Sequence, residues 1–333
     1  MTDLMRAVVI REFGGPEKLE LATIERPRPR PGEVLIRVHA FGLNRSEYHF
    51  RSGVAESGVL PRVPGIEATG IVEDAPGTDF RPGQQVVTMM GGMGRSFDGG
   101  YAEYVTVPHA QVIPFRSALE WSTLGAIPEM LQTAWGSLST GVQANEGDSI
   151  LIRGGTSSVG LAIAALAVIR GMRVFSTTRN PDRFQHLRDL GVEHPLLENG
   201  EVAAQVREIA PDGVDGAVEL VGATTLRDTL RAVRTGGTAC FTGMLADDWI
   251  IPEFYPIAWL PNGVRLTAYS GEANDLPQNV LQDFIDAVER GDARVPIGHV
   301  YQMDEIAQAH TDMESGRYVG KLVTVPWSGS DLS

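Results

Sequence analysis

A buried strand, a glycine-rich turn and a long apolar helix follow one another between residues 148 and 169. The strand reads DSILIR, the turn reads GGTSSVG at residues 154–160, and the helix is a run of small and aliphatic residues. Against the pattern G-x-G-x-x-G, Gly155 and Gly160 match the first and third glycines, and Ser157 replaces the second. This order of elements predicts a dinucleotide-binding turn.

In such a turn, the pyrophosphate lies on free N–H groups at the helix N-terminus. We therefore expect Gly155, Ser157, Ser158, Val159 and Gly160 to bind the cofactor, with the two serine hydroxyls as additional donors. The alternative is a plain strand-to-helix turn, in which the glycines only permit tight packing.

The end of the second strand, residues 173–177, bears on which nicotinamide cofactor binds. A carboxylate there binds the ribose 2′-hydroxyl of NAD, but this stretch ends in hydroxyl residues and Arg179, with Thr178 before it and Arg183 one helical turn further. Guanidinium groups bind a 2′-phosphate through charge-assisted hydrogen bonds. Asp182 is better placed to interact with the helix dipole. The pattern favours NADP(H), the alternative being that both arginines are solvated surface residues.

The remaining chain divides by pattern near residue 125. Before it lie short β-type runs at residues 6–10, 33–40, 68–73 and 85–88, broken by glycine and proline. After it, strands alternate with helices, with further strands at 216–221 and 238–242 and a helix at 181–190, which predicts a parallel sheet. We expect a helix at 276–290 to close this unit, and residues 294–326 to return to mixed β character.

Composition excludes several classes of protein. The 42 acidic and 28 basic residues give a net charge of −14, which disfavours nucleic-acid binding. We expect no membrane span and a cytoplasmic location, because no run of 18 apolar residues and no signal-peptide pattern occurs. The single cysteine, Cys240, cannot form an intrachain disulfide or a four-cysteine zinc lobe.

Six motifs together resemble one family. They are GLNRSEYHFRSG at residues 42–53, PRVPGIEATG at 61–70, FRPG at 80–83, GGYAEYV at 99–105, LQTA at 131–134 and the turn at 154–160. The combination resembles the zinc-independent quinone oxidoreductase branch of the medium-chain dehydrogenase/reductase superfamily. The resemblance implies an α/β chain with a GroES-like β-rich catalytic domain, residues 1–125 and 293–333, and an inserted Rossmann NADP-binding domain with a doubly wound parallel sheet, residues 126–292.

The resemblance also bears on metal binding. Zinc alcohol dehydrogenases of this superfamily carry a cysteine ligand and a Gly-His-Glu motif where this chain has Asn44 and Gly65-Ile66-Glu67. Isoleucine cannot ligate zinc and an amide is a poor ligand, so we expect no metal.

Without a Lewis acid, quinones and α,β-unsaturated carbonyl compounds are the expected small electrophilic substrates, because their acceptor carbon delocalises charge into oxygen. The resemblance implies that Asn44, Tyr48 and His49 line the reacting centre. The family often has tyrosine at the position of His49. That histidine is either a proton donor near neutral pH or a residue that lines the cleft or binds a backbone oxygen.

Further cofactor contacts are implied by the same resemblance. Thr133 matches a threonine near the nicotinamide ribose, Gly222 and Gly243 match turns at later strand ends, and Lys321 lies where the C-terminal segment passes the cofactor. The alternatives are tight-turn glycines and a solvated edge-strand lysine. We interpret Glu67 and Glu129 as hydrogen-bond partners within the protein rather than as general bases.

The expected function is therefore an NADPH-dependent, zinc-free oxidoreductase that transfers hydride to a quinone or enone. An enoyl-thioester reductase of the same superfamily and a non-catalytic NADPH-binding protein remain alternatives. The apolar, aromatic stretch at residues 250–260 predicts a homodimer, because relatives pair two sheets in this region, unless the stretch is a buried intrachain loop.

Overall fold

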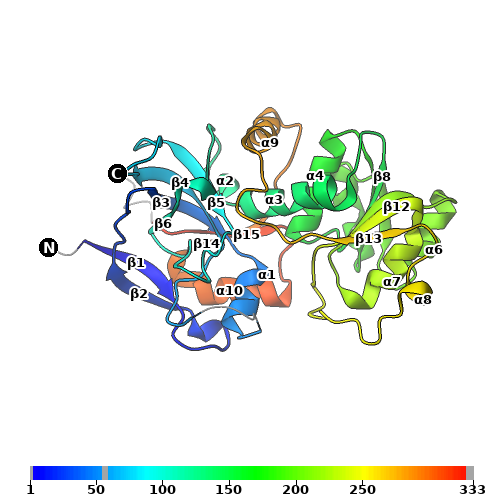
Figure 1. The fold of residues 1–333 in the computed structure, drawn as a ribbon, viewed down its shortest axis with the longest axis horizontal. Coiled ribbons are helices and arrows are strands. Elements are labelled where there is room, and N and C mark those ends of the chain that lie inside the picture. Colours follow the sequence, from blue (N-terminus) through cyan, green and yellow to red (C-terminus); the bar gives the residue numbers. More distant parts are fainter. Residues whose placement is uncertain (1–2, 55–58, 328–333) are drawn as a thin grey trace. The chain divides into compact units, whose positions relative to one another are not determined.

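The computed structural model describes residues 3–54 and 59–327. The chain forms two compact units (Figure 1). Unit 1 comprises Met1–Glu129, Glu272–Glu289 and Val295–Ser333, and unit 2 comprises Met130–Gly271 and Arg290–Arg294. The predicted functional domains, 1–125 with 293–333 and 126–292, use slightly different boundaries and remain predictions; residues 1–2 and 328–333 lie outside the described chain.

Unit 1 is built on a seven-stranded sheet and a separate hairpin. The sheet has the order β14-β15-β3-β4-β5-β7, and β6 pairs with β3 beside this path. Only β14 and β15 are parallel; the other pairs are antiparallel. The strands of unit 1 are β1 (Leu4–Val9), β2 (Glu20–Glu25), β3 (Glu33–Gly42), β4 (Glu67–Asp74), β5 (Gln85–Met89), β6 (Tyr104–Pro108), β7 (Val112–Pro114), β14 (Ile297–Gln302) and β15 (Lys321–Val325).

Four helices belong to unit 1: α1 (Arg45–Arg51), α2 (Trp121–Leu124), α9 (Gln278–Arg290) and α10 (Ile306–Ser315). Although we expected the helix at 276–290 to close the strand–helix unit, α9 groups with unit 1 up to Glu289. Gln282 bonds the backbone of Arg116, and Glu289 accepts a hydrogen bond of 2.6 Å from the Ser117 hydroxyl. These polar contacts fix α9 beside the segment that follows β7.

Unit 2 contains a six-stranded sheet in which every neighbouring pair is parallel. The order is β10-β9-β8-β11-β12-β13, which is the Rossmann order 3-2-1-4-5-6. The strands are β8 (Ser149–Arg153), β9 (Arg173–Thr178), β10 (His194–Leu197), β11 (Val214–Glu219), β12 (Val233–Phe241) and β13 (Arg265–Ala268); the helices are α4 (Ser158–Ile169), α5 (Phe184–Asp189), α6 (Val202–Ile209), α7 (Ala223–Ala232) and α8 (Pro256–Trp259). Helix α3 (Pro128–Gly136) spans the boundary between the units.

The α/β class and the doubly wound parallel sheet are confirmed. Strands β3, β4, β5 and β9 cover the expected runs, and β1, β8, β11 and β12 overlap them with ends that differ. The strand β10 and the helices α6, α7 and α10 were not identified; β10 has only four residues, and the three helices have eight to ten residues each. Among the described residues, no helix is both long and apolar enough to cross a bilayer.

Candidate functional site

Asn44 begins helix α1 in unit 1 as its N-cap residue. Its backbone is extended, and Asn44 and Glu47 form a capping box in which the Asn44 N–H donates to Glu47 Oε2 at 2.9 Å. The second Glu47 oxygen accepts the Ile66 N–H at 2.8 Å. Helix α1 is therefore tied to the loop before β4, and Asn44 is 92% buried in this setting, with 8% of its surface exposed.

The Asn44 amide lies between a carboxylate and an ammonium group. Its Nδ2 donates to Glu67 Oε1 at 2.9 Å, and Lys321 Nζ donates to Asn44 Oδ1 at 2.5 Å. The same Nζ lies 2.9 Å from Glu67 Oε1 and 3.5 Å from Glu129 Oε2. Glu67 Oε2 accepts the Glu129 N–H at 2.9 Å. We call Asn44, Glu67, Glu129 and Lys321 the amide cluster.

Lys321 and Glu67 are fully buried. The alternative of a solvated edge-strand lysine is therefore wrong, because β15 lies between β14 and β3 inside the sheet. Burial alone would lower the pKa of Lys321, but the charges of Glu67 and Glu129 outweigh it and raise this pKa. Lys321 is therefore a permanent cation at neutral pH. Its contact with the cofactor stays a prediction.

Glu47 was not identified from the sequence, although it lies beside the amide cluster. Burial raises the pKa of its carboxyl to about 7; the Ile66 N–H opposes this shift, and the charge of Glu67 adds to it. The signal that sequence analysis overlooked is the spacing Asn44-x-x-Glu47, which is a capping-box pattern.

Tyr48 and His49 lie on the same short helix as Asn44. Asn44 is the N-cap, and Tyr48 and His49 lie in α1 itself. Tyr48 is half-buried and His49 is buried, with their ring centroids 5.3 Å apart. The three predicted catalytic residues therefore lie within one short segment, and their catalytic roles stay predictions.

Asn44 and Ile66, which stand where the zinc enzymes have metal ligands, are both buried. Asn44 is engaged by Glu67 and Lys321, so a cation already adjoins its carbonyl oxygen. Across residues 3–54 and 59–327, no group of three or more His, Cys, Asp or Glu side chains is arranged to hold a metal ion.

In unit 2, the glycine turn leads directly from β8 into α4. Ser157 is the N-cap of α4: its Oγ accepts the Gly160 N–H at 3.1 Å and donates to the Gly154 carbonyl at 2.8 Å. A Cβ on Gly160 would lie 2.5 Å from the Gly154 oxygen, and one on Gly155 would overlap Ser176 Oγ. The turn therefore needs glycine at both positions.

The same turn offers donors for an anion. The Ser158 and Val159 N–H groups begin the helix and have no carbonyl four residues back within it. The Ser157 hydroxyl donates its hydrogen bond to the Gly154 carbonyl, and this bond competes with its predicted role as a donor to the cofactor. Pyrophosphate binding at this turn stays a prediction, and its donors would chiefly be backbone groups.

The end of β9 presents basic rather than acidic side chains. Thr178 ends the strand, and its Oγ1 accepts the Asn180 N–H at 3.2 Å. Arg179 is exposed and Arg183 is half-buried, and neither guanidinium has an ion pair within the described chain. Asn180 caps the following 3-10 turn through the Asp182 N–H. Both arginines are thus available to a phosphate group.

A buried ionic network at the carboxyl edge of the sheet was not identified from the sequence. Arg153 is fully buried at the end of β8; it binds Glu198 through two hydrogen bonds of 2.8 and 2.6 Å and Asp228 at 2.6 Å. Its neighbour across the sheet is Glu219, the last residue of β11, which accepts the Thr229 hydroxyl at 2.5 Å.

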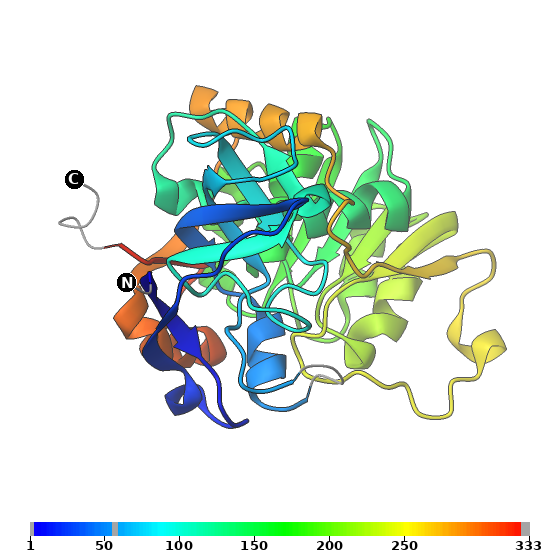
Figure 2. The ribbon, with the colours of Figure 1, turned by 60° about the vertical axis from the view of Figure 1, so that its left-hand side comes forward.

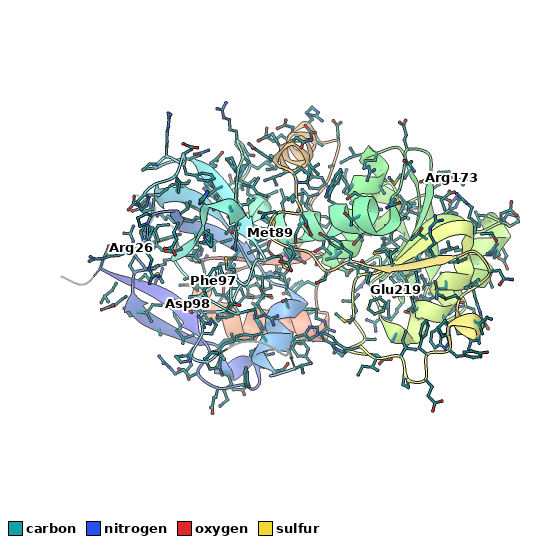
Figure 3. The ribbon with its side chains drawn as sticks, in the orientation of Figure 1. Arg26, Met89, Phe97, Asp98, Arg173 and Glu219 are labelled. Atoms are coloured by element: carbon teal, nitrogen blue, oxygen red, sulfur yellow. The ribbon has the colours of Figure 1, made fainter. Side chains whose placement is uncertain are left out.

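Glu219 marks the carboxyl edge of the parallel sheet and Arg173 its amino edge (Figure 3). Burial raises the pKa of Glu219. Between β8 and β11 the strand order reverses, which is where open α/β sheets bind ligands. The sequence signal for this ionic network was an arginine and a glutamate, each at the end of an apolar strand.

The other predicted cofactor residues of unit 2 lie in α3 and in two turns. Thr133 is in α3, where its carbonyl accepts the Ser137 hydroxyl at 2.6 Å. Gly222 follows Glu219 with φ of +135°, a conformation that favours glycine. A Cβ on Gly243 would lie 2.8 Å from the Leu220 oxygen. The tight-turn requirement accounts for both glycines, and their cofactor contacts stay predictions.

An open pocket with a volume of about 150 Å³ lies in unit 1. Phe97 and Asp98 line it, together with Met5, Val63 and Tyr104 (Figure 3). None of the predicted catalytic or cofactor-binding residues is among its lining residues. The amide cluster is therefore a separate feature of the unit.

Comparisons with known proteins agree with these features. A family model described as "Alcohol dehydrogenase GroES-like domain" matches residues 30–117, and one described as "Zinc-binding dehydrogenase" matches residues 190–324. A quinone oxidoreductase of Rattus norvegicus is 28% identical over 330 residues, covering 96% of this chain and 97% of the relative.

Two solved structures are similar over nearly the whole chain. An NAD-dependent alcohol dehydrogenase is 27% identical with a TM-score of 0.87, covering 97% of this chain and 100% of that one. Mycobacterial Rv1454c complexed with NADPH is 27% identical with a TM-score of 0.82, with the same coverage. The two structures carry names that refer to different nicotinamide cofactors.

The raised pKa of Glu47 predicts a pH-dependent stability. Because this pKa is about 7 in the folded chain against 4.5 ordinarily, Glu47 contributes stability below pH 4.5 that is lost as the pH rises through 7. Relative to Glu47→Gln, we expect the unfolding free energy of the wild type to fall between these limits by at most about 3 kcal/mol. Urea denaturation at each pH measures it. The exposed Glu208→Gln is the control, and a pH-independent difference for Glu47→Gln would contradict the assignment.

Proposed function

Because this chain belongs to the medium-chain dehydrogenase/reductase superfamily, in its quinone oxidoreductase branch, we propose that it is a zinc-free, NADPH-dependent reductase of quinones or α,β-unsaturated carbonyl compounds. The observation that carries this proposal is the Asn44 amide, held between Glu67 and Lys321. The superfamily supports an oxidoreductase with a nicotinamide cofactor; the acceptor, the choice of NADPH and the absence of zinc are proposals.

The glycine turn and the end of β9 support NADPH as the cofactor. Bound NADPH supplies a hydride. The Ser158 and Val159 N–H groups would hold its pyrophosphate, next to Gly155 and Gly160, where a Cβ would collide with Ser176 Oγ or the Gly154 oxygen. Arg179, exposed and without an ion pair in the described chain, would bind the 2′-phosphate with Arg183 nearby. Thr133, Thr178, Gly222 and Gly243 complete the proposed cofactor contacts.

The amide cluster supports a carbonyl or quinone acceptor. Hydride addition to such a molecule places negative charge on oxygen, which a fixed N–H donor stabilises. Asn44 Nδ2 carries two hydrogens, and Glu67 takes one of them. The second is the proposed donor to the substrate oxygen, with Tyr48 or His49 supplying the proton.

Zinc-free catalysis is supported by the residues at the ligand positions. The matching family model is described as "Zinc-binding dehydrogenase", but this chain has Asn44 and Ile66 where the zinc enzymes carry cysteine and histidine. An aliphatic side chain cannot ligate zinc. Stoichiometric zinc in the purified protein, measured by elemental analysis, would contradict this part of the proposal.

Arg179→Ala tests the cofactor preference. We expect the KM for NADPH to rise about 10-fold to 100-fold while the KM for NADH is unchanged, because only the 2′-phosphate loses its partner. Arg188→Ala, at another exposed arginine on α5, is the matched control. A wild type that prefers NADH, or an Arg179 variant with an unchanged NADPH to NADH ratio, would reject the proposal.

Asn44→Ala tests the substrate site. We expect kcat with a naphthoquinone or an enone to fall about 10²-fold to 10³-fold with the Kd for NADPH unchanged, since one oxyanion donor is lost. Steady-state kinetics and fluorescence titration measure the two constants. Higher activity on enoyl thioesters would instead support the enoyl-thioester alternative. NADPH binding without turnover of any electrophile would support a non-catalytic binding protein.

We also propose that the protein is a homodimer. Ile250, Tyr255 and Ile257 are 73%, 63% and 81% exposed, so the alternative of a buried intrachain loop at 250–260 is wrong. Figure 2 shows this yellow segment, with α8, as a long loop that stands off the sheet of unit 2. Strand β13 is the edge of that sheet. Exposed apolar side chains beside an open edge favour pairing with a second copy.

Ile257→Glu tests the dimer. A charge at an apolar contact is costly to desolvate, so we expect the variant to be monomeric at micromolar concentration while the wild type is dimeric. Light scattering coupled to size exclusion measures the mass. Ile209→Glu, at an exposed position of α6, is the control and should leave the dimer intact. A monomeric wild type would refute the proposal.

A further inference from the structure

An asparagine side-chain amide can be flipped by about 180° with almost no change of shape. The flip exchanges the NH2 group, which donates hydrogen bonds, with the carbonyl oxygen, which accepts them. A substrate oxygen that gains negative charge needs the donor. The catalytic use of Asn44 therefore requires something that selects the orientation. Lys321 and Glu67 are the two side chains bonded to the polar ends of this amide.

We propose that Lys321 and Glu67 are positioning residues that lock the Asn44 amide with its N–H groups, rather than its carbonyl oxygen, available to the substrate oxygen. The inference rests on the proposed function and assigns the pair a task in it. Flipping the amide would place Nδ2 against the Lys321 ammonium and Oδ1 against the Glu67 carboxylate. Both contacts are repulsive, and both groups are buried, where such repulsion is weakly screened.

The pair occupies a space that the fold provides specifically. Gly42, in β3, lies beside it, and a Cβ at that position would overlap both Lys321 Cε and Glu67 Oε1. The three charged members come from different elements: Glu67 begins β4, Glu129 lies in α3 and Lys321 begins β15. The Glu129 N–H fixes the second Glu67 oxygen at 2.9 Å, so the carboxylate cannot rotate freely.

Stability alone does not account for this arrangement. A buried ion pair often contributes no more stability than well-packed apolar residues of similar volume, because both charges are desolvated. Direct binding of a cofactor phosphate would require the Lys321 ammonium to leave Asn44 and Glu67. Orientation of the amide uses all the observed contacts without breaking any.

The test replaces both charges together, so that no single buried charge is left unpaired. We expect Lys321→Met/Glu67→Gln to fold, to bind NADPH within about threefold of the wild-type Kd, and to lose at least about 10-fold in kcat on a naphthoquinone. In an Asn44→Ala background, the same pair of changes should alter kcat less than twofold. Lys18→Met, at the only other lysine, is the matched control.

The outcomes are distinguishable. A wild type that reduces no quinone or enone refutes the proposed function, and this inference with it. If Asn44→Ala is impaired but the double variant is not, the inference alone fails. Equal losses of kcat in the wild-type and Asn44→Ala backgrounds would indicate a merely structural role. A raised NADPH Kd with unchanged kcat would identify Lys321 as a cofactor contact instead.

A measurement that needs no double variant uses the lysine content. The chain has two lysines, so ¹⁵N-lysine labelling gives two side-chain ammonium signals, which Lys18→Met assigns. We expect Asn44→Ala to shift the Lys321 signal and speed its proton exchange, while the Lys18 signal stays constant. Binding of a non-reducible quinone analogue in the presence of NADP⁺ should shift it as well. No response of Lys321 to either change would overturn the inference.

Discussion

The ion pair between Lys321 and Glu67 determines much of what unit 1 can do. The pair is fully buried, and it joins the first residue of β4 to the first residue of β15. Lys321 Nζ lies 2.9 Å from Glu67 Oε1, and the Asn44 amide forms a hydrogen bond with each partner. Burying an ammonium without a partner costs several kcal/mol of folding free energy, which is a large part of the total stability of a domain. Gly42 and Glu129 are therefore as necessary to the site as Asn44, since they make the space and supply the second carboxylate.

Unit 2 also buries charged side chains, at the carboxyl edge of its sheet. Arg153 and Glu219 end the two strands between which the strand order reverses, and both side chains are buried. Glu198, Asp228 and Thr229 complete their hydrogen bonds. Because these charges are satisfied inside the unit, the backbone donors of the glycine turn and the guanidinium of Arg179 remain for a ligand. The network thus shapes the edge without competing for an anion.

Features that depend on a short stretch of residues could be predicted from the sequence alone. The strand, turn and helix around Gly155 and Gly160 follow from residues within one short stretch, and so does the basic end of β9. Lys321 was different: its partner Asn44 is 277 residues away, and nothing near it in the sequence indicates a buried carboxylate. Glu47 and Arg153 have local signals, a capping-box spacing and a position at the end of an apolar strand, but these signals do not indicate how deeply the two side chains are buried. Their environments arise from pairing between β3, β4 and β15, or between β8 and β11.

In the proposed zinc-free site, a protein cation takes the place of the metal, and this changes what the site would stabilise. A zinc ion binds the substrate oxygen directly and withdraws charge through that bond, whereas in the proposed arrangement the Asn44 amide would lie between Lys321 and the substrate oxygen. The amide transmits orientation and a hydrogen bond rather than a full charge. Such a donor is adequate where the accepting molecule delocalises its own negative charge, as quinones and enones do, and poor where one carbonyl oxygen must carry all of it. The chemistry of Asn44 and Lys321 therefore favours the delocalised acceptors on physical grounds, independently of the names of similar proteins.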